Sequence, residues 1–137
     1  VVLREADAGR LSLEERLPLT QADIVPHAPV TSQHLEQGWM TIGTLAEAAQ
    51  KTSDNVAANL LVRRLGGPEA FTAKVHSIHR SGFRLDRYEP HMNLVPPGEV
   101  RDTATAEGMG LIVANLINPE LASTRGLSAA SRETLIQ

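Results

Sequence analysis

The chain has 137 residues, a length that fits one domain with a buried core. Its 42% hydrophobic and 21% charged residues are typical of a globular protein and exclude a disordered tail. The formal net charge of -3 disfavours a nucleic-acid-binding surface, and the absence of cysteine excludes a disulfide framework and a thiolate nucleophile. No apolar run approaches the roughly 20 residues that span a bilayer, and the charged first residues do not form a signal peptide.

Helix patterns dominate the chain, and strand patterns are few. In chain order the helix patterns cover residues 1–8, 41–52, 55–65, 68–79, 103–117 and 128–137. Gly9 ends the first at a position where a left-handed turn suits glycine, and Pro68 opens the fourth. Two long segments marked by prolines, 17–40 and 81–102, lie between the helices, and loops of that length are usually functional or disordered. We therefore expect an all-α fold with long loops, organised as a single helical domain over residues 1–137.

The last two helical segments carry clear helix signals. The fifth carries a strong apolar series at i, i+3, i+4, i+7 and i+8, which is typical of a helix: Met109, Ile112, Val113, Leu116 and Ile117. The sixth has Ser128 as its expected cap. Because the chain starts and stops within helical patterns, we expect it to be an internal portion of a larger protein.

The first motif with chemical interest is Ser53-Asp54-Asn55, between two helical patterns. One interpretation is a plain helix cap, since these residue types satisfy the free amide groups at a helix start. The other is that the cap also directs a hydroxyl and an amide into a cleft. Asp54 is then the structural member, and Ser53 and Asn55 face a ligand.

A second motif lies in the long loop, where Glu89 is followed four residues later by Asn93. A carboxylate and an amide at this spacing can hold one water between them, which would make the glutamate a general base. The alternative is an ordinary exposed loop carboxylate. Arg87 and Asp102 flank the same loop and can close its neck as an ion pair, or they are two unrelated surface charges of little energetic weight.

In this order the three motifs resemble those of the class A serine β-lactamases. The resemblance rests on Ser53-Asp54-Asn55, on R-Y-E-P-H-M-N at residues 87–93 and on Arg101-Asp102-Thr103. It extends to D-A-G at 7–9, P-V-T at 29–31, S-D-N-V-A-A-N-L-L at 53–61 and G-G-P at 66–68, so it runs nearly from end to end. It implies the helical domain of the β-lactamase/transpeptidase-like fold, with residues 81–102 as an omega loop. The glutamate in that loop favours a β-lactamase over a penicillin-binding protein.

The resemblance implies catalytic and substrate-binding roles for five residues. Glu89 and Asn93 would hold and deprotonate the water that hydrolyses the acyl-enzyme, and Ser53 would relay a proton to the lactam nitrogen. Asn55 would donate to the side-chain amide carbonyl of the bound drug. His27 lies where the family often has an aromatic residue at the mouth of the cleft.

The resemblance also implies structural roles and no cofactor. Asp54 and Asn59 would be buried supports for the cleft and the loop, and Arg87 and Asp102 would pair across the loop neck. The bond before Pro90 is expected to be cis. No metal is implied. His76 and His79, with His91 in the loop, could suggest a metal site, but neither an H-E-x-x-H spacing nor a nearby carboxylate ligand set accompanies them.

Two family signatures are absent from the chain. Neither of its two lysines, Lys51 and Lys74, has a serine three residues before it, so there is no S-x-x-K. The K-T-G strand is also missing. We expect the nucleophile just upstream of Val1 and the strand beyond Gln137, in an α/β half that would be the partner of this chain.

Two interpretations therefore stay open. In the first, the chain is part of a periplasmic or secreted enzyme that hydrolyses β-lactams by serine acylation and deacylation. In the second, it is a catalytically inactive helical domain, natural or engineered, that serves as a folding module or as one half of a complementation pair. Both predict no hydrolysis by this chain alone, and neither involves nucleic acid or a membrane.

Overall fold

The structure, a computed structural model, describes residues 1–80, 82–121 and 124–137. Its helices are α1 (Val2–Asp7), α2 (Ile42–Thr52), α3 (Asn55–Arg64), α4 (Gly67–Ile78), α5 (Ala106–Ile117) and α6 (Ala129–Ile136). Short 3-10 turns lie at Gln21–Asp23, Thr31–His34, His91–Asn93 and Pro119–Leu121. The mostly helical architecture confirms the expected all-α fold. Ser81, where the second long loop was expected to begin, lies outside the described residues.

A two-stranded antiparallel sheet, β1 (Arg16–Pro18) with β2 (Trp39–Thr41), is the element that the sequence did not predict. Leu17 pairs with Met40, and both side chains are buried. The strands lie at the two ends of the long segment 17–40, so that segment leaves the core and returns to it at one place. The sheet closes the loop that later contributes to the site.

The larger hydrophobic core lies between α2, α3 and this sheet. Ile42, Leu45 and Val56 have no exposed surface in it. Thr41 caps α2, because its side-chain oxygen accepts the Thr44 N–H at 3.2 Å. The core holds α2 and α3 as a rigid pair.

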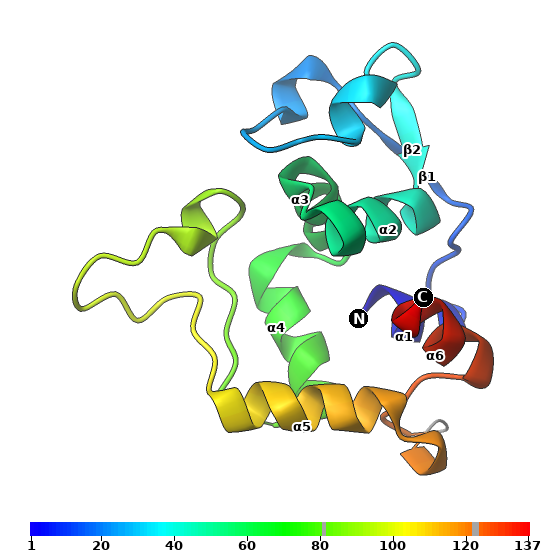
Figure 1. Ribbon diagram of the computed structural model, residues 1–137, viewed down its shortest axis with the longest axis vertical. Helices are drawn as coiled ribbons and strands as arrows, with labels where there is room; N and C mark the ends of the chain where they lie inside the picture. The colour runs from blue at the N-terminus through cyan, green and yellow to red at the C-terminus, as the bar shows by residue number, and fades with distance from the viewer. Residues whose placement is uncertain (81, 122–123) are drawn as a thin grey trace.

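A second, smaller core joins α4 to α5. It contains Val75, Ile78 and Ile112. Figure 1 shows α5 lying across the base of the molecule, with α4 rising from it toward α3. The chain turns from α3 into α4 at Gly66, whose φ of 100° is in the left-handed region that favours glycine.

Helices α1 and α6 pack together, so the two chain ends lie close to each other (Figure 1). Asp7 joins them: its carboxylate accepts the Ser128 N–H at 2.8 Å and the hydroxyls of Ser128 and Ser131 at 2.7 and 2.8 Å. Gly9, with φ of 68°, ends α1 as expected from the sequence. Its N–H donates to the Ala6 carbonyl, as in a Schellman motif.

A buried ion cluster connects α1 to α4. Glu5 is buried, and its carboxylate accepts hydrogen bonds from Arg10 at 2.7 and 2.8 Å and from Lys74 at 2.8 Å. The pKa of Glu5 is lowered to about 2, mainly by the hydrogen bonds from the Arg10 guanidinium and also by Lys74, while burial acts in the opposite direction. This charge ties the first helix to the rest of the domain.

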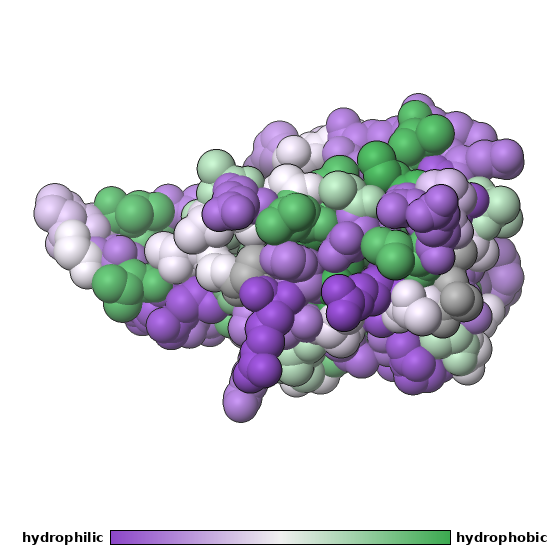
Figure 2. Space-filling model, turned by 90° about the horizontal axis from the view of Figure 1, so that it is seen from below, coloured by the Kyte–Doolittle hydropathy of each residue, from purple (hydrophilic) through white to green (hydrophobic). Residues whose placement is uncertain are grey.

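The apolar series of α5 is only partly covered by the rest of the domain. Ile112 is buried and Leu116 is half-buried, but Met109, Val113 and Ile117 are 42%, 49% and 43% exposed. The reason is that α5 has one helix neighbour, α4, with enough contact to cover it, and one neighbour buries only one side. Figure 2, the view from below, shows apolar side chains at several separate places on this face. The helix itself begins three residues later than predicted, because Thr105 caps it by accepting the Gly108 N–H.

Candidate functional site

The Ser53-Asp54-Asn55 turn connects α2 to α3, and Asp54 is its buried centre. Asp54 has no exposed surface, and it caps α3 by accepting the Ala57 N–H at 3.0 Å. Its other oxygen accepts the N–H groups of Val30 and Thr31 at 3.0 and 2.9 Å, and the Thr31 hydroxyl donates at 2.9 Å to the oxygen that accepts the Ala57 N–H. Burial raises the pKa of Asp54, but these donors outweigh it, so the pKa lies below its ordinary value. Asp54 therefore stays ionised and fixes residues 30 and 31 against α3.

Ser53 and Asn55 flank this buried carboxylate on the exposed side of the turn. Ser53 is exposed, and its φ of 54° is left-handed, a strained conformation for serine. The Asn55 side chain donates to the Pro26 carbonyl at 2.9 Å, and its backbone N–H donates to the His27 carbonyl at 3.0 Å. The second Asn55 side-chain hydrogen is left for another acceptor.

His27 lies beside the same turn, on the exposed loop that Asn55 holds. Its Nε2 is 2.9 Å from the Thr52 carbonyl, and its φ of 62° is also left-handed. Strained residues are held in place only by surrounding contacts, and they cluster at functional sites. Ser53, Asn55 and His27 thus come together around one turn.

Glu89 lies on the other loop, and helix α3 fixes its backbone. Asn59 is buried on α3; its side-chain oxygen accepts the Glu89 N–H at 2.8 Å, and its amide donates to the Glu89 carbonyl at 3.0 Å. The Glu89–Pro90 peptide bond is cis, as the resemblance implies. The Glu89 carboxylate accepts one hydrogen bond from the Asn93 amide at 2.7 Å. This leaves carboxylate lone pairs free to hold a water.

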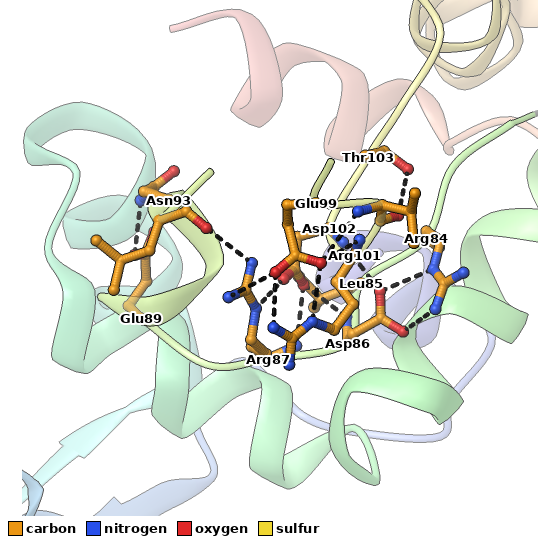
Figure 3. A network of polar contacts seen from close by, with 12 residues as sticks. Arg84, Leu85, Asp86, Arg87, Glu89, Asn93, Glu99, Arg101, Asp102 and Thr103 are labelled. Atoms are coloured by element: carbon orange, nitrogen blue, oxygen red, sulfur yellow. Dashed lines mark hydrogen bonds and ion pairs between the residues drawn. The ribbon is translucent and has the colours of Figure 1, made fainter. Parts of the chain in front are cut away.

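The neck of the loop is closed by Arg87 and Asp102 (Figure 3). Their side chains form a mostly buried ion pair, and Asp102 also accepts the backbone N–H groups of Asp86 and Arg87 at 2.6 and 2.9 Å. Asp102 adopts a left-handed φ of 54° to do so. Burial raises the pKa of Asp102, but these donors hold it below its ordinary value. The Arg87 guanidinium also donates to the Leu94 carbonyl at 3.2 Å, which connects the neck to the part of the loop next to Asn93.

The sequence motifs did not predict the further charges that extend this neck. Arg84 pairs with Asp86, and Arg101 pairs with Glu99 at 2.6 Å. The pKa of Asp86 and that of Glu99 are each lowered to about 2, mainly by these guanidinium groups. Figure 3 shows this cluster beside the Glu89–Asn93 pair. The sequence offered one signal for these contacts: in R-L-D at 84–86 and in E-V-R at 99–101, an arginine lies two residues from a carboxylate.

The arrangement contains the chemistry of a general base and of hydrogen-bond donors. A carboxylate next to a neutral amide can accept a proton from a bound water, and the exposed hydroxyl and amide at the α2–α3 turn can contact a ligand. Among residues 1–80, 82–121 and 124–137, no group of three or more His, Cys, Asp or Glu is placed to hold a metal ion. No helix in those ranges is long and apolar enough to cross a membrane.

Comparison with known proteins gives one consistent result. The model of the "Beta-lactamase enzyme family" matches residues 1–137. A "Beta-lactamase" of Rhodobacter capsulatus is 44% identical over 124 residues, which are 87% of this chain and 42% of that protein.

Solved structures agree with this match. An ancestral class A β-lactamase has a TM-score of 0.90 and 41% identity over 98% of this chain and 50% of its own. A β-lactamase from Xanthomonas campestris has a TM-score of 0.88 and 36% identity over 98% of this chain and 48% of its own. The chain thus spans about half the length of these relatives. It belongs to the β-lactamase enzyme family, within class A.

Proposed function

We propose that this chain is the helical-domain part of an enzyme that hydrolyses β-lactam antibiotics by serine acylation and Glu89-assisted deacylation. The observation that carries the proposal is the Glu89 site: Asn59 fixes the backbone on both sides of the residue, and the carboxylate has Asn93 as its hydrogen-bond partner. A base is effective when its position is fixed and its lone pairs remain available. Similarity to class A β-lactamases supports the reaction.

In this mechanism the two loops act on different steps. Ser53 relays a proton to the lactam nitrogen as the ring opens, and Asn55 donates its second amide hydrogen to the side-chain carbonyl of the drug. Glu89 then takes a proton from the water held with Asn93, the water oxygen bonds to the acyl carbon, and the ester bond to the enzyme breaks as a proton passes to the departing serine oxygen. His27 lines the rim of the cleft. Asp54, Asn59, Arg87, Pro90 and Asp102 hold these groups in place.

The nucleophile and the K-T-G strand belong to the α/β half that complements this chain, and the assembled enzyme acts in the periplasm or outside the cell. The chain itself lacks S-x-x-K and K-T-G. Loss of the nucleophile costs on the order of 10⁶ in rate in triad-type enzymes. We therefore expect the isolated chain, as a folding module or a complementation half, to show no turnover of a chromogenic cephalosporin. Turnover by the purified chain would contradict this assignment.

The test of Glu89 uses this chain together with the complementary half of a class A relative. Glu89→Gln keeps the shape of the side chain but removes the base, so the acyl-enzyme should accumulate in the intact-mass spectrum while turnover falls about 10²–10⁴-fold. The matched control is Glu36→Gln, a change at an exposed glutamate, which should leave turnover unchanged. Normal turnover by the Glu89→Gln assembly, without an accumulated adduct, would reject the role of Glu89.

A further inference from the structure

One arginine of α3, Arg63, contacts both long loops. Its guanidinium donates to the Asp23 carboxylate of the first loop at 2.6 Å, and it lies over the ring of Tyr88 in the second, with its central carbon 5.7 Å from the ring centroid. A cation within about 6 Å of an aromatic ring centroid is attracted to the face of the ring. Because Tyr88 immediately precedes Glu89, Arg63 acts on the loop one residue away from the proposed base.

The position of the Arg63 guanidinium is fixed by its carboxylate partner. One oxygen of Asp23 accepts the N–H and the hydroxyl of Thr20 at 2.9 and 2.8 Å, and the other oxygen accepts the hydrogen bond from Arg63. An exposed ion pair contributes little to stability by itself. This pair has a further consequence, because a guanidinium that is bonded to a fixed carboxylate is restrained from turning away from Tyr88.

The Tyr88 ring extends to the corner between α3 and α4. A Cβ placed on Gly67, the first residue of α4, would be 3.5 Å from the Tyr88 hydroxyl oxygen, which is an ordinary van der Waals distance. The hydroxyl end of the ring thus lies beside the start of α4, while Arg63 lies over the ring. The Tyr88 carbonyl accepts the Met92 N–H at 3.1 Å, so the same residue begins the turn that carries Asn93.

Arg63 and Asn59 restrain neighbouring residues of the loop. Asn59 binds the N–H and the carbonyl of Glu89 and so fixes the backbone of that residue. The contacts of Tyr88 fix the chain immediately before it, and with it the direction in which the Glu89 side chain leaves the backbone. A general base must lie within hydrogen-bond reach of its water, and a displacement of about 1 Å can cost on the order of 10² in rate.

We propose that Arg63 is a positioning residue for deacylation, and that it acts by holding the Tyr88 ring at the α3–α4 corner so that the Glu89 carboxylate stays in place beside its water. This inference rests on the proposed function, because it assigns Arg63 to the step that Glu89 carries out. It also separates the two chemical steps: Arg63 acts through Tyr88 on the base, so its loss should slow deacylation and leave acylation unaffected.

The test uses the assembly of this chain with the complementary half of a class A relative, and it measures the rate constants of acylation and deacylation separately by stopped-flow with a chromogenic cephalosporin. Arg63→Gln removes the cation, so deacylation should slow about three- to tenfold while acylation changes less than about twofold. The acyl-enzyme should then accumulate in the intact-mass spectrum. Arg63→Lys keeps a cation and should restore deacylation to within about twofold of the unmodified assembly. Equal slowing by Arg63→Lys and Arg63→Gln would overturn the proposal.

Arg64 offers the matched control. It is the adjacent arginine in the last turn of α3, and its guanidinium also pairs with a carboxylate, that of Glu15, at 2.6 and 2.8 Å. Arg64→Gln removes the same charge from the same end of the helix, so it should lower stability at least as much but change deacylation less than about twofold. Equal slowing of deacylation by Arg63→Gln and Arg64→Gln, or equal slowing of both steps by Arg63→Gln, would contradict the assignment.

A double-mutant cycle tests whether Arg63 acts through the ring. Tyr88→Leu removes the aromatic face but keeps an apolar side chain, and it should slow deacylation at least as much as Arg63→Gln does. The double variant should be no slower than Tyr88→Leu alone, since both changes remove the same contact. Two effects that multiply in the double variant would show that Arg63 acts by another route, and the proposal would fail.

A further measurement on the whole chain does not depend on turnover. Tyr88 is the only tyrosine, so tyrosine labelled with ¹³C in its ring gives one set of ring signals in NMR spectra. Arg63→Gln should shift these signals and Arg64→Gln should not, and the reverse result would overturn the proposal. If the unmodified assembly fails to turn over the cephalosporin, the proposed function is refuted and this inference with it. If it turns over and Arg63→Gln deacylates normally, only this inference is refuted.

Discussion

Asp54→Asn tests whether one buried carboxylate holds the first loop of the site against α3. Suppose that the new amide oxygen keeps the Ala57 N–H and the Thr31 hydroxyl, and that the new NH₂ group replaces the other carboxylate oxygen. The N–H groups of Val30 and Thr31, now 3.0 and 2.9 Å from an acceptor, would then face a donor. Each buried unsatisfied group costs about 1–3 kcal/mol, so the loss should be about 4 kcal/mol. That is a large share of the roughly 5–15 kcal/mol that stabilises a domain.

Urea denaturation followed by circular dichroism measures this loss, with the slope m expected to stay the same. The matched control is Asp23→Asn, a half-buried carboxylate that forms a capping box with Thr20 and an ion pair with Arg63 at 2.6 Å, and this change should cost at most about 1 kcal/mol. The pKa of Asp54 is lower in the folded chain, so its contribution is present above the unfolded value near 3.9 and is lost as pH falls through the folded pKa. The difference between the two proteins should therefore shrink below about pH 4. A loss under about 1 kcal/mol at pH 7 would refute the reasoning.

Three further changes test other parts of the structure. Asp102→Asn removes a charge that Arg87 pairs with, so the backbone amides of residues 86–102 should exchange hydrogen at least tenfold faster, as measured by mass spectrometry. The free energy of unfolding should fall by only about 1–2 kcal/mol. Unchanged exchange would show that the neck does not restrain the loop. Glu5→Gln should lower the free energy of unfolding by about 2–3 kcal/mol at pH 7, as measured in urea. Because the folded-state pKa of Glu5 is about 2, its contribution is present above pH 4.5 and is lost as pH falls toward 2. An equal loss at pH 2 would contradict this. Gly66→Ala should lower stability by about 1–3 kcal/mol, since φ is 100° and a Cβ would lie 2.9 Å from the Cβ of Ala70. Gly110→Ala, on a helix with open space around it, should raise stability by about 0.5–1 kcal/mol. Thermal melts that shift in the same direction for both variants would refute this distinction.

The sequence predicted the helices well because each carries its own local signals. Thr41, Asp54 and Ser128 each accept an N–H at the start of a helix, and Gly9 ends one. The motif residues around the two loops could be named because the resemblance was specific. Local signals of this kind depend on a few neighbouring residues and therefore survive without tertiary information.

The features that the sequence did not predict depend on distant packing. The apolar series of α5 predicts the helix, but which of its residues are covered depends on the number of neighbouring helices, and sequence periodicity does not give that number. The β1–β2 pair has only three residues in each strand, which are too few to show the alternating pattern by which strands are recognised in a sequence. The pairs Arg84–Asp86 and Glu99–Arg101 are local, but the contacts that join them across the neck, such as the Asp102 N–H donating to Asp86 at 2.9 Å, depend on the close approach of the two ends of the loop.

Helix α3 explains how two long loops are held in fixed positions. Its cap, Asp54, binds the backbone of residues 30 and 31, and Asn59, on the following turn, binds the backbone of Glu89 through both its N–H and its carbonyl. Both anchors are buried, 0% and 2% exposed, and α3 is packed in the larger core. The positions of the two loops are therefore set by one rigid helix and not by the loops themselves. Loss of either anchor should displace one side of the site while the other keeps its geometry, so the effects of Asp54→Asn and Asn59→Ala on loop hydrogen exchange should be confined to different loops.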